Sequence, residues 1–236
     1  MSPPALPPDP RVRRFVAESP INRAHIAAFV AEAAGSIAAG ARVLDAGAGA
    51  APYRDLFAHT RYTTADWAQS MHPEALASDV VAPLDDLPLD DGSFDAGLAT
   101  EVLEHVPDPV TVLRELHRVL VPGGRLWLTT PLVWELHEEP HDHARYTDHG
   151  LRDLLHRTGF GEVAVRPFGG WFATAGQVLR SYGSVTGRGA PGRPLPGRLA
   201  SSVLWRAGPL VARLDRADPR QGLPLGYGTA ARKPAG

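Results

Sequence analysis

The sequence of 236 residues contains no cysteine. This absence excludes disulfide bonds, a thiolate nucleophile and cysteine-ligated metal sites, and it is typical of a reducing compartment. No run approaches the roughly 18 uninterrupted apolar residues of a membrane-spanning helix. The proline-rich start, Met1–Pro10, lacks the apolar stretch of an export signal. We therefore expect a cytoplasmic protein.

Strong net charge is absent as well. The formal net charge is −2, and 44% of the residues are hydrophobic. This balance predicts no nucleic-acid partner, and the apolar content is sufficient for one domain with a sizeable core. Lysine occurs once, as Lys233.

Segments with strand patterns alternate with segments of helical spacing along most of the chain. We expect strands at 42–45, 62–66, 79–81, 94–100, 125–130, 161–167 and 225–231, and helices at 21–37, from 52 to beyond 57, at 109–120, 147–156 and 199–214. Asp108 and Thr147 are the expected N-caps of two helices, and residues 122–124 are expected to end one. This order predicts a three-layer, Rossmann-like α/β sandwich with a mostly parallel sheet.

A glycine-rich turn follows the first expected strand. Asp45 ends that strand, and Gly47 and Gly49 follow, spaced by one residue. Such a turn lets the backbone approach a nucleoside-type cofactor. A dinucleotide would favour a third glycine where Ala51 stands, whereas the cationic, phosphate-free S-adenosylmethionine favours nearby carboxylates. Asp66 lies at the distance typical of a ribose-binding acid, which fits either cofactor.

Five segments separate the two cofactors when they are taken together. In chain order they are Asp45-Ala-Gly-Ala-Gly49, Asp66, Leu87–Asp95, Glu101-Val-Leu-Glu-His-Val106 and Leu120-Val-Pro-Gly-Gly124. Because these segments occur together and in this order, the chain resembles the class I S-adenosylmethionine-dependent methyltransferases. The resemblance is to the type found among small-molecule and ubiquinone-pathway enzymes. The resemblance covers about residues 42–168.

The resemblance implies a seven-stranded sheet with an antiparallel last strand, S-adenosyl-L-methionine as cofactor, and roles for individual residues. Asp45, Gly47 and Gly49 would contact the methionine end of the cofactor. Asp66 would bind the ribose hydroxyls and Asp79 would lie near the adenine amine. Beside the sulfonium end, the resemblance implies Thr100 and Glu101. Ala51 departs from the family pattern of three glycines, and its small methyl group is expected to be tolerated.

Two clusters could serve the methyl acceptor. One is Glu101-x-x-Glu104-His105, and the other is the run of histidines and acids from 137 to 146. Removal of a hydroxyl proton needs a base or a metal. We expect His141 to be the base or a substrate contact, with His105 and His143 as further catalytic candidates. Arg145 is instead expected to tie down its loop by pairing with an acid.

The first cluster resembles the Glu-x-x-Glu-His motif of metal-dependent relatives. These are ubiquinone-pathway O-methyltransferases and small-RNA end 2′-O-methyltransferases, and a later histidine completes their site. A metal would then use Glu101, Glu104, His105 and His141. The same string also occurs in relatives without a known metal, where Glu104 and His105 only begin a helix, so both readings stay open.

The segment after the resemblance is locally basic. Eight arginines fall between positions 180 and 220, against Asp215 and Asp218. We interpret residues 1–19 as a largely disordered tail, 20–168 as the methyltransferase core, 169–223 as a helical, basic lid or insertion, and 224–236 as the last strand and a tail. The amphipathic helix in the basic segment could pack within the protein, form a dimer contact or lie on an anionic bilayer.

The function most consistent with these features is transfer of a methyl group from S-adenosylmethionine to a small-molecule, glycan or lipid-type acceptor, at oxygen. Two alternatives remain. A nicotinamide-dependent oxidoreductase would lack its third glycine and a Tyr-x-x-x-Lys pair. A non-catalytic homologue would keep the cofactor pocket but have no acceptor site.

Overall fold

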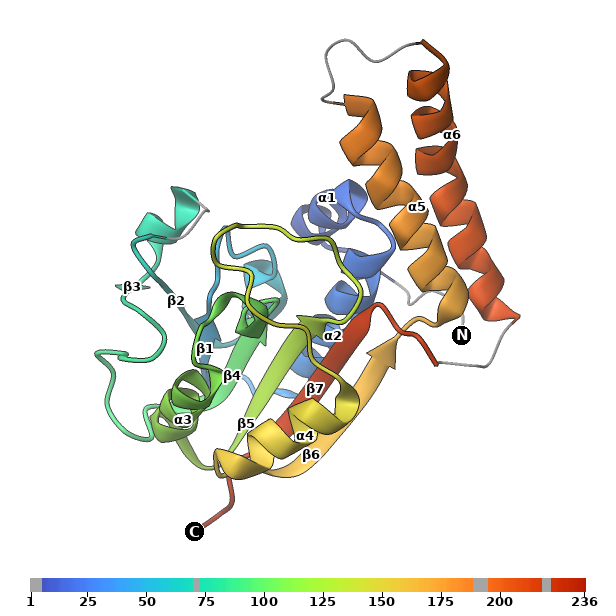
Figure 1. Cartoon of the computed structure of the whole chain (residues 1–236). Helices are drawn as coiled ribbons and strands as arrows, with labels where there is room; N and C mark the ends of the chain where they lie inside the picture. The colour runs from blue at the N-terminus through green and yellow to red at the C-terminus, as the bar shows by residue number, and fades with distance from the viewer. Residues whose placement is uncertain (1–5, 70–72, 189–194, 218–221) are drawn as a thin grey trace.

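A single seven-stranded sheet organises the part of the chain that the computed structural model describes, residues 6–69, 73–188, 195–217 and 222–236. The strand order is β3-β2-β1-β4-β5-β7-β6 (Figure 1). Only β7 is antiparallel to its neighbours. The expected sheet with its antiparallel last strand is therefore confirmed. The strands are β1 (Arg42–Ala46), β2 (Arg61–Asp66), β3 (Val80–Val81), β4 (Phe94–Thr100), β5 (Leu120–Pro131), β6 (Gly161–Phe168) and β7 (Gly226–Arg232).

Helices cover both faces of the sheet and form the three layers. On one face lie α3 (Pro109–Val119) and α4 (Asp148–Arg157), and on the other lie α1 (Pro10–Glu18) and α2 (Asn22–Ser36) (Figure 1). Each face has its own apolar core, with Leu113 and Leu155 fully buried in one and Val30 in the other. The central strands are buried almost along their full length, as expected for parallel strands covered on both sides.

Side-chain caps fix the starts of the two front helices. The Asp108 carboxylate accepts hydrogen bonds from the backbone N–H groups of Val110 and Thr111, and the Thr147 hydroxyl accepts one from Gly150. Both expected N-caps are confirmed. The end of α3 differs from expectation, because β5 begins directly at Leu120 and residues 122–124 lie within this strand.

The prediction of a disordered N-terminal tail is wrong for residues 10–18, which form α1. Asp9 caps this helix and Pro10 occupies its first turn, where the missing N–H costs nothing. Val12 and Val16, spaced by one helical turn, are buried against the back of the sheet. Their burial explains why this segment is ordered despite its prolines.

The helix expected from residue 52 onward is also wrong, because the structure forms only the short 3-10 helix η1 (Arg54–Phe57) there. Two further 3-10 helices, η2 (Pro73–Ala77) and η3 (Leu103–His105), lie in other connections. As a result, the loop after β1 is followed by a compact turn rather than by a long covering helix.

The basic segment forms a hairpin of two long helices, α5 (Trp171–Arg188) and α6 (Leu195–Ala212), followed by the 3-10 helix η4 (Arg213–Arg216). The expected loop at 187–197 is helical at both ends, and its residues 189–194 lie outside the described part. Figure 1 shows the hairpin projecting from the end of β6, past α1 and away from the sheet. In this view it does not form the expected cover over the strand ends.

Candidate functional site

The glycine-rich turn after β1 lies between the carboxyl ends of β1 and β2. The backbone N–H of Gly47 donates to the carbonyl oxygen of Ala65 in β2 at 2.8 Å. Gly47 has a φ of +74°, and a Cβ atom there would lie 2.5 Å from a methyl carbon of Val102. This position therefore requires glycine. The turn continues through Gly49 and Ala51, whose φ angles of 51° and 47° are also left-handed.

Two carboxylates flank this turn. The Asp66 carboxylate is 6% exposed and accepts hydrogen bonds from the N–H groups of Gly49, at 2.7 Å, and Trp67, at 2.8 Å. It can accept about two more, because an ionised carboxylate has about four lone-pair sites. Asp45 is buried beside it, and the Tyr62 hydroxyl donates to one of its oxygens. The other Asp45 oxygen has no partner among the described residues, and burial raises the pKa of Asp45 to about 7.

Asp79 lies in the segment just before β3 and contacts β2. Its carboxylate accepts from both the backbone N–H and the hydroxyl of Thr64, each at 2.9 Å. These bonds, with Arg54 nearby at 3.7 Å, hold the pKa of Asp79 below its ordinary value. Thr64 lies two residues before the end of β2, so this carboxylate ties β2 to the segment before β3. The adenine role of Asp79 stays a prediction.

Thr100 ends β4, and Glu101 follows it in a left-handed conformation with a φ of 54°. The Thr129 hydroxyl donates to the Glu101 carboxylate at 2.8 Å, and the Asn22 amide lies 3.5 Å from its second oxygen. Burial raises the pKa of Glu101 to about 7. The carboxylate of Glu101 is therefore directed toward β5 and α2.

The segment between β5 and α4, residues 132–147, arches over the carboxyl ends of the strands (Figure 1). The two terminal nitrogens of Arg145, Nη1 and Nη2, donate to the carboxylate of Asp142, whose side chain is 1% exposed. This pairing holds the pKa of Asp142 below its ordinary value. The Tyr146 hydroxyl donates to the Leu103 carbonyl oxygen at 2.9 Å. The pairing of Arg145 with Asp142 confirms the expectation that Arg145 ties down its loop through an acid.

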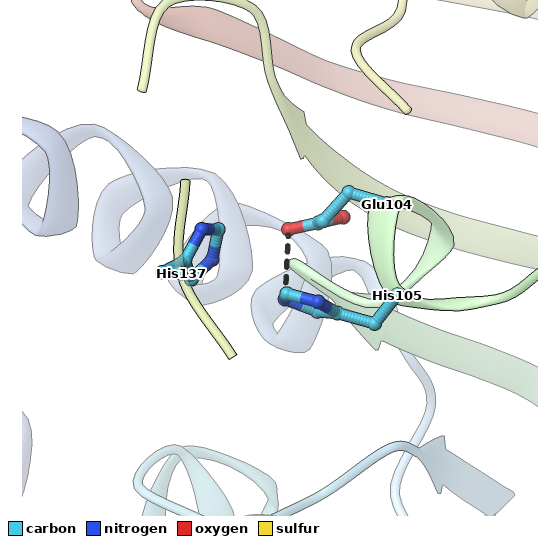
Figure 2. Close-up of side chains that lie close together, drawn as sticks. All are labelled: Glu104, His105 and His137. Atoms are coloured by element: carbon cyan, nitrogen blue, oxygen red, sulfur yellow. Dashed lines mark ion pairs between the residues drawn. The ribbon is translucent and has the colours of Figure 1, made fainter. Parts of the chain in front are cut away.

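Glu104, His105 and His137 form a compact cluster under this segment (Figure 2). Each offers one ligand atom, and these atoms lie within 4.8 Å of one another. His105 Nε2 lies 3.8 Å from Glu104 Oε1. Glu104 and His105 come from η3 and His137 comes from the arching segment, so the fold joins residues that are far apart in the chain.

The hydrogen bonds of the cluster leave its ligand atoms open. His105 Nδ1 lies 3.0 Å from the His141 carbonyl oxygen, and His137 Nδ1 lies 3.1 Å from that of Glu135. A carbonyl oxygen only accepts, so Nδ1 is the donor in each contact, and in a neutral imidazole this leaves the lone pair on Nε2. Metal-binding histidines show this same outer bonding pattern.

The Glu104 side chain is fully buried, and neither of its oxygens has a hydrogen-bond partner among the described residues. Burial, reinforced by the nearby Glu101 carboxylate, raises the pKa of Glu104 well above its ordinary value. Burial also lowers the pKa of His105, which favours its neutral form. A buried, unpaired carboxylate is costly unless it is protonated or meets a cation. The donor set fits a divalent cation bound by two imidazoles and one carboxylate.

His137 is the residue that the sequence interpretation did not single out. His141, which the expected metal set contained instead, turns its ring toward Trp67 at a centroid distance of 5.2 Å. Its carbonyl oxygen, rather than its ring, contacts His105. His143 is exposed, and its backbone N–H donates to the Glu104 carbonyl oxygen at 2.7 Å. The structure therefore brings Glu104 and His105 together with His137, and the rings of His141 and His143 are not part of this side-chain cluster.

Comparison with known proteins identifies one family model. Residues 44–128 match a methyltransferase domain. This segment begins in β1 and ends in β5, so it contains the glycine turn, Asp66 and the Glu104–His105 pair.

Curated relatives match a similar part of the chain. A ubiquinone biosynthesis O-methyltransferase of Xanthomonas oryzae pv. oryzae is 40% identical over 104 residues, which are 39% of this chain and 44% of the relative. The match thus spans less than half the length of that relative.

Solved structures match most of the chain at low identity. The [4+2]-cyclase SpnF is 20% identical with a TM-score of 0.59, covering 89% of this chain and 83% of that one. A Haemonchus contortus phosphoethanolamine N-methyltransferase in complex with S-adenosyl-L-methionine is 15% identical with a TM-score of 0.53, covering 94% and 60%. These similarities show the fold. The matched domain and the curated relatives support a class I S-adenosylmethionine-dependent methyltransferase domain over this part of the chain.

Proposed function

We propose that this chain transfers the methyl group of S-adenosylmethionine to a hydroxyl oxygen of a small-molecule acceptor. The observation that carries the proposal is that the glycine turn with Asp66 and the Glu104–His105–His137 cluster share the carboxyl edge of one sheet. In parallel sheets, ligands bind at this edge. Trp67, which follows Asp66 in the chain, is in ring contact with His141, whose carbonyl oxygen contacts His105. The name of the curated relatives, an O-methyltransferase, supports oxygen as the acceptor atom.

The cofactor half of the site would use the residues around the glycine turn. Gly47 and Gly49 leave room for the methionine end to approach the backbone, and Asp66 offers its remaining lone pairs to the ribose diol. The unpartnered oxygen of buried Asp45 would accept from the cofactor through a hydrogen bond or a water. Thr100 and Glu101, at the end of β4, would lie beside the sulfonium, where a carboxylate favours the positive charge.

The acceptor half would use the cluster as a cation site. Glu104, His105 and His137 would hold a divalent cation, which would supply Lewis acidity that lowers the pKa of an acceptor hydroxyl. Residues of the arching segment hold these ligands in place: the His141 carbonyl oxygen orients His105, and the Asp142–Arg145 pair fixes the backbone next to His137.

Methyl transfer would form one bond and break one bond in line. The acceptor oxygen attacks the methyl carbon, the carbon–sulfur bond breaks, and its electron pair stays on sulfur in S-adenosylhomocysteine. The hydroxyl proton passes to the His141 ring, which is not held by the cluster and lies between Trp67 and His143. His141 is therefore assigned as the base, and positioning of the acceptor accounts for much of the remaining acceleration.

The test measures S-adenosylhomocysteine release with a panel of phenolic, glycan and lipid-type hydroxyl acceptors, after chelation and after adding Mg²⁺, Mn²⁺ or Zn²⁺. His137→Ala should lose cation binding by calorimetry and the cation-dependent turnover. His141→Ala should keep cation and cofactor binding but lose about 100-fold or more in kcat, as expected for a general base.

His143→Ala is the matched control, since it removes an exposed imidazole from the same segment. It should change neither cation binding nor turnover by more than about twofold. Turnover of the chelated protein that equals the cation-loaded rate would remove the cation from the proposal. Cofactor binding without turnover on every acceptor class would favour a non-catalytic homologue.

A further inference from the structure

Large apolar side chains are concentrated on the outer surface of the α5–α6 hairpin. The described part of the chain has ten exposed large apolar residues, and six of them lie on the hairpin and η4. The six are Trp171, Val178, Tyr182, Val203, Leu210 and Leu214. Scattered exposed apolar residues need no explanation, but such a concentration on one projecting element marks an interaction surface.

The stripe at the end of the hairpin has regular helical spacing. Val203, Leu210 and Leu214 follow one another at i, i+7 and i+11, so they align along one face, and they are between 51% and 65% exposed. Arg206 in α6 and Arg213 in η4, the 3-10 helix that also contains Leu214, are both exposed and lie next to this stripe in the sequence. We call these five residues the α6 outer face.

The opposite side of α6 is fixed by close contact with α5 through small residues. A Cβ atom added to Gly176 would lie 2.4 Å from the Gly208 carbonyl oxygen, and one added to Gly183 would lie 2.6 Å from the Trp205 backbone nitrogen. The Arg180 guanidinium stacks on Trp205, with 4.4 Å to the ring centroid. Because the two backbones approach closely at these glycines, little room is left there for large side chains between the helices.

Charge decides between the classes of partner. From residue 163 to residue 214 the sequence contains seven arginines and not one aspartate or glutamate, although the whole chain has 26 acids. Asp215, the first acid afterwards, accepts hydrogen bonds from the backbone at the start of α5. A face that combines exposed apolar side chains with exposed arginines is complementary to an anionic lipid surface.

Other partners fit this face less well. A second copy related by twofold symmetry would bring Arg206 and Arg213 close to the same arginines of its partner. A nucleic acid would leave Val203, Leu210 and Leu214 against phosphates.

We propose that the α6 outer face docks this protein onto an anionic bilayer, with the apolar stripe at the level of the lipid headgroups and the arginines on lipid phosphates. This inference is independent of the proposed function, because none of its residues belongs to the candidate site.

The experiment is co-sedimentation of the full chain with vesicles of phosphatidylcholine, with and without phosphatidylglycerol, at low and high salt. Wild-type protein should bind the anionic vesicles at low salt and dissociate at high salt. Val203→Ser/Leu210→Ser and Arg206→Glu/Arg213→Glu should each lower partitioning by about tenfold or more. Leu76→Ser, which removes a 64% exposed leucine far from the hairpin, should leave partitioning unchanged.

Near-ultraviolet circular dichroism and S-adenosylhomocysteine binding verify that each variant is folded. Wild-type protein that binds no vesicle, or variants that bind as well as wild type, would overturn the proposal. So would light scattering that shows a dimer which the same α6 variants dissociate, since the face would then be an interface between copies. Equal binding of the neutral and anionic vesicles would overturn the role of the arginines.

Discussion

At the scale of single residues, left-handed backbone marks the candidate site. Gly47 and Gly49 adopt it without cost, but Ala51 and Glu101 adopt it with a Cβ atom, at φ angles of 47° and 54°. Such a conformation costs a residue with a Cβ about 1–2 kcal/mol. The methyl group of Ala51 is small, as expected from the sequence. The free-energy cost of alanine at this position comes from the backbone angle and not from the volume of the methyl group.

Ala51→Gly should therefore stabilise the protein by about 1 kcal/mol, because glycine relieves the strain at this φ. Ala48→Gly is the matched control: Ala48 is equally buried in the same turn but is not left-handed. It should destabilise by about 0.5–1 kcal/mol, since glycine there only adds freedom to the unfolded chain. Urea unfolding measures both, and shifts of the same sign would contradict the strain.

At the scale of elements, the site depends on contacts between strand ends rather than on one helix. Asp66 at the end of β2 holds the turn after β1 through the N–H of Gly49, and Tyr62 of β2 holds Asp45. Because η1 is short, these cross-strand bonds take over the role that a long helix after β1 would have in fixing the turn.

Asp66→Asn should weaken S-adenosylhomocysteine binding by about 10-fold to 100-fold in calorimetry, because the amide loses the charge and one acceptor toward the ribose diol. Asp79→Asn is the comparison. Asp79 bonds to Thr64 of β2, so this variant should lower stability, and it should weaken cofactor binding less than Asp66→Asn does. Equal losses in both variants would instead support contact of Asp79 with the cofactor.

At the scale of the whole molecule, the candidate site couples folding to pH. Burial raises the pKa of Asp45 from 3.8 and that of Glu101 from 4.5, each to about 7, and it raises the pKa of Glu104 well above its ordinary value. The folded chain thus holds protons that the unfolded chain has released, so stability falls as pH rises from about 4.5 through 7. Burial lowers the pKa of His25 from 6.5 to about 4, which opposes this trend below pH 6.5 only.

The chelated protein should therefore lose thermal stability between pH 6.5 and 8. In this range the raised pKa values of the buried acids lower stability, and the titration of His25 no longer opposes them. Glu104→Gln should flatten this loss and be more stable than wild type at pH 8 by about 1–3 kcal/mol, because it removes a buried charge with no partner. Added Mn²⁺ should stabilise wild type more at pH 8 than at pH 6, since a cation binds the ionised carboxylate. A melting temperature that rises with pH in the chelated protein would contradict the protonated state of Glu104.

Local patterns predicted most of the fold, and long-range geometry decided the rest. The strand patterns of β1, β2 and β4 and the caps Asp108 and Thr147 are short-range features, and these predictions are confirmed. The segment 132–147 has no regular period, so its sequence does not reveal which histidine turns toward Glu104. Its path depends on Asp142 and Arg145, and it selects His137 for the cluster instead of His141.

The start of α1 carries helix signals in the sequence, although disorder is predicted there. Asp9 before Pro10 is a helix-start signal, and Val12 and Val16 have helical spacing, yet the neighbouring prolines suggested disorder. The short η1 could not be foreseen in the same way, because the choice between a 3-10 turn and a longer helix after β1 depends on packing against α1 and β2.

The position of β7 has a consequence for how the chain is assembled during synthesis. This strand is made after the hairpin, yet it is inserted between β5 and β6 and pairs with both. While the chain is still on the ribosome, β5 and β6 each present an open edge until residues 226–232 emerge. The single lysine, Lys233, follows β7. It donates to the carbonyl oxygens of His117 and Leu120 and so ties the end of β7 to the end of α3 and the start of β5. A nascent chain released before this point would expose the open edge of β5 and an unpaired β6, and open strand edges are prone to pair with other chains.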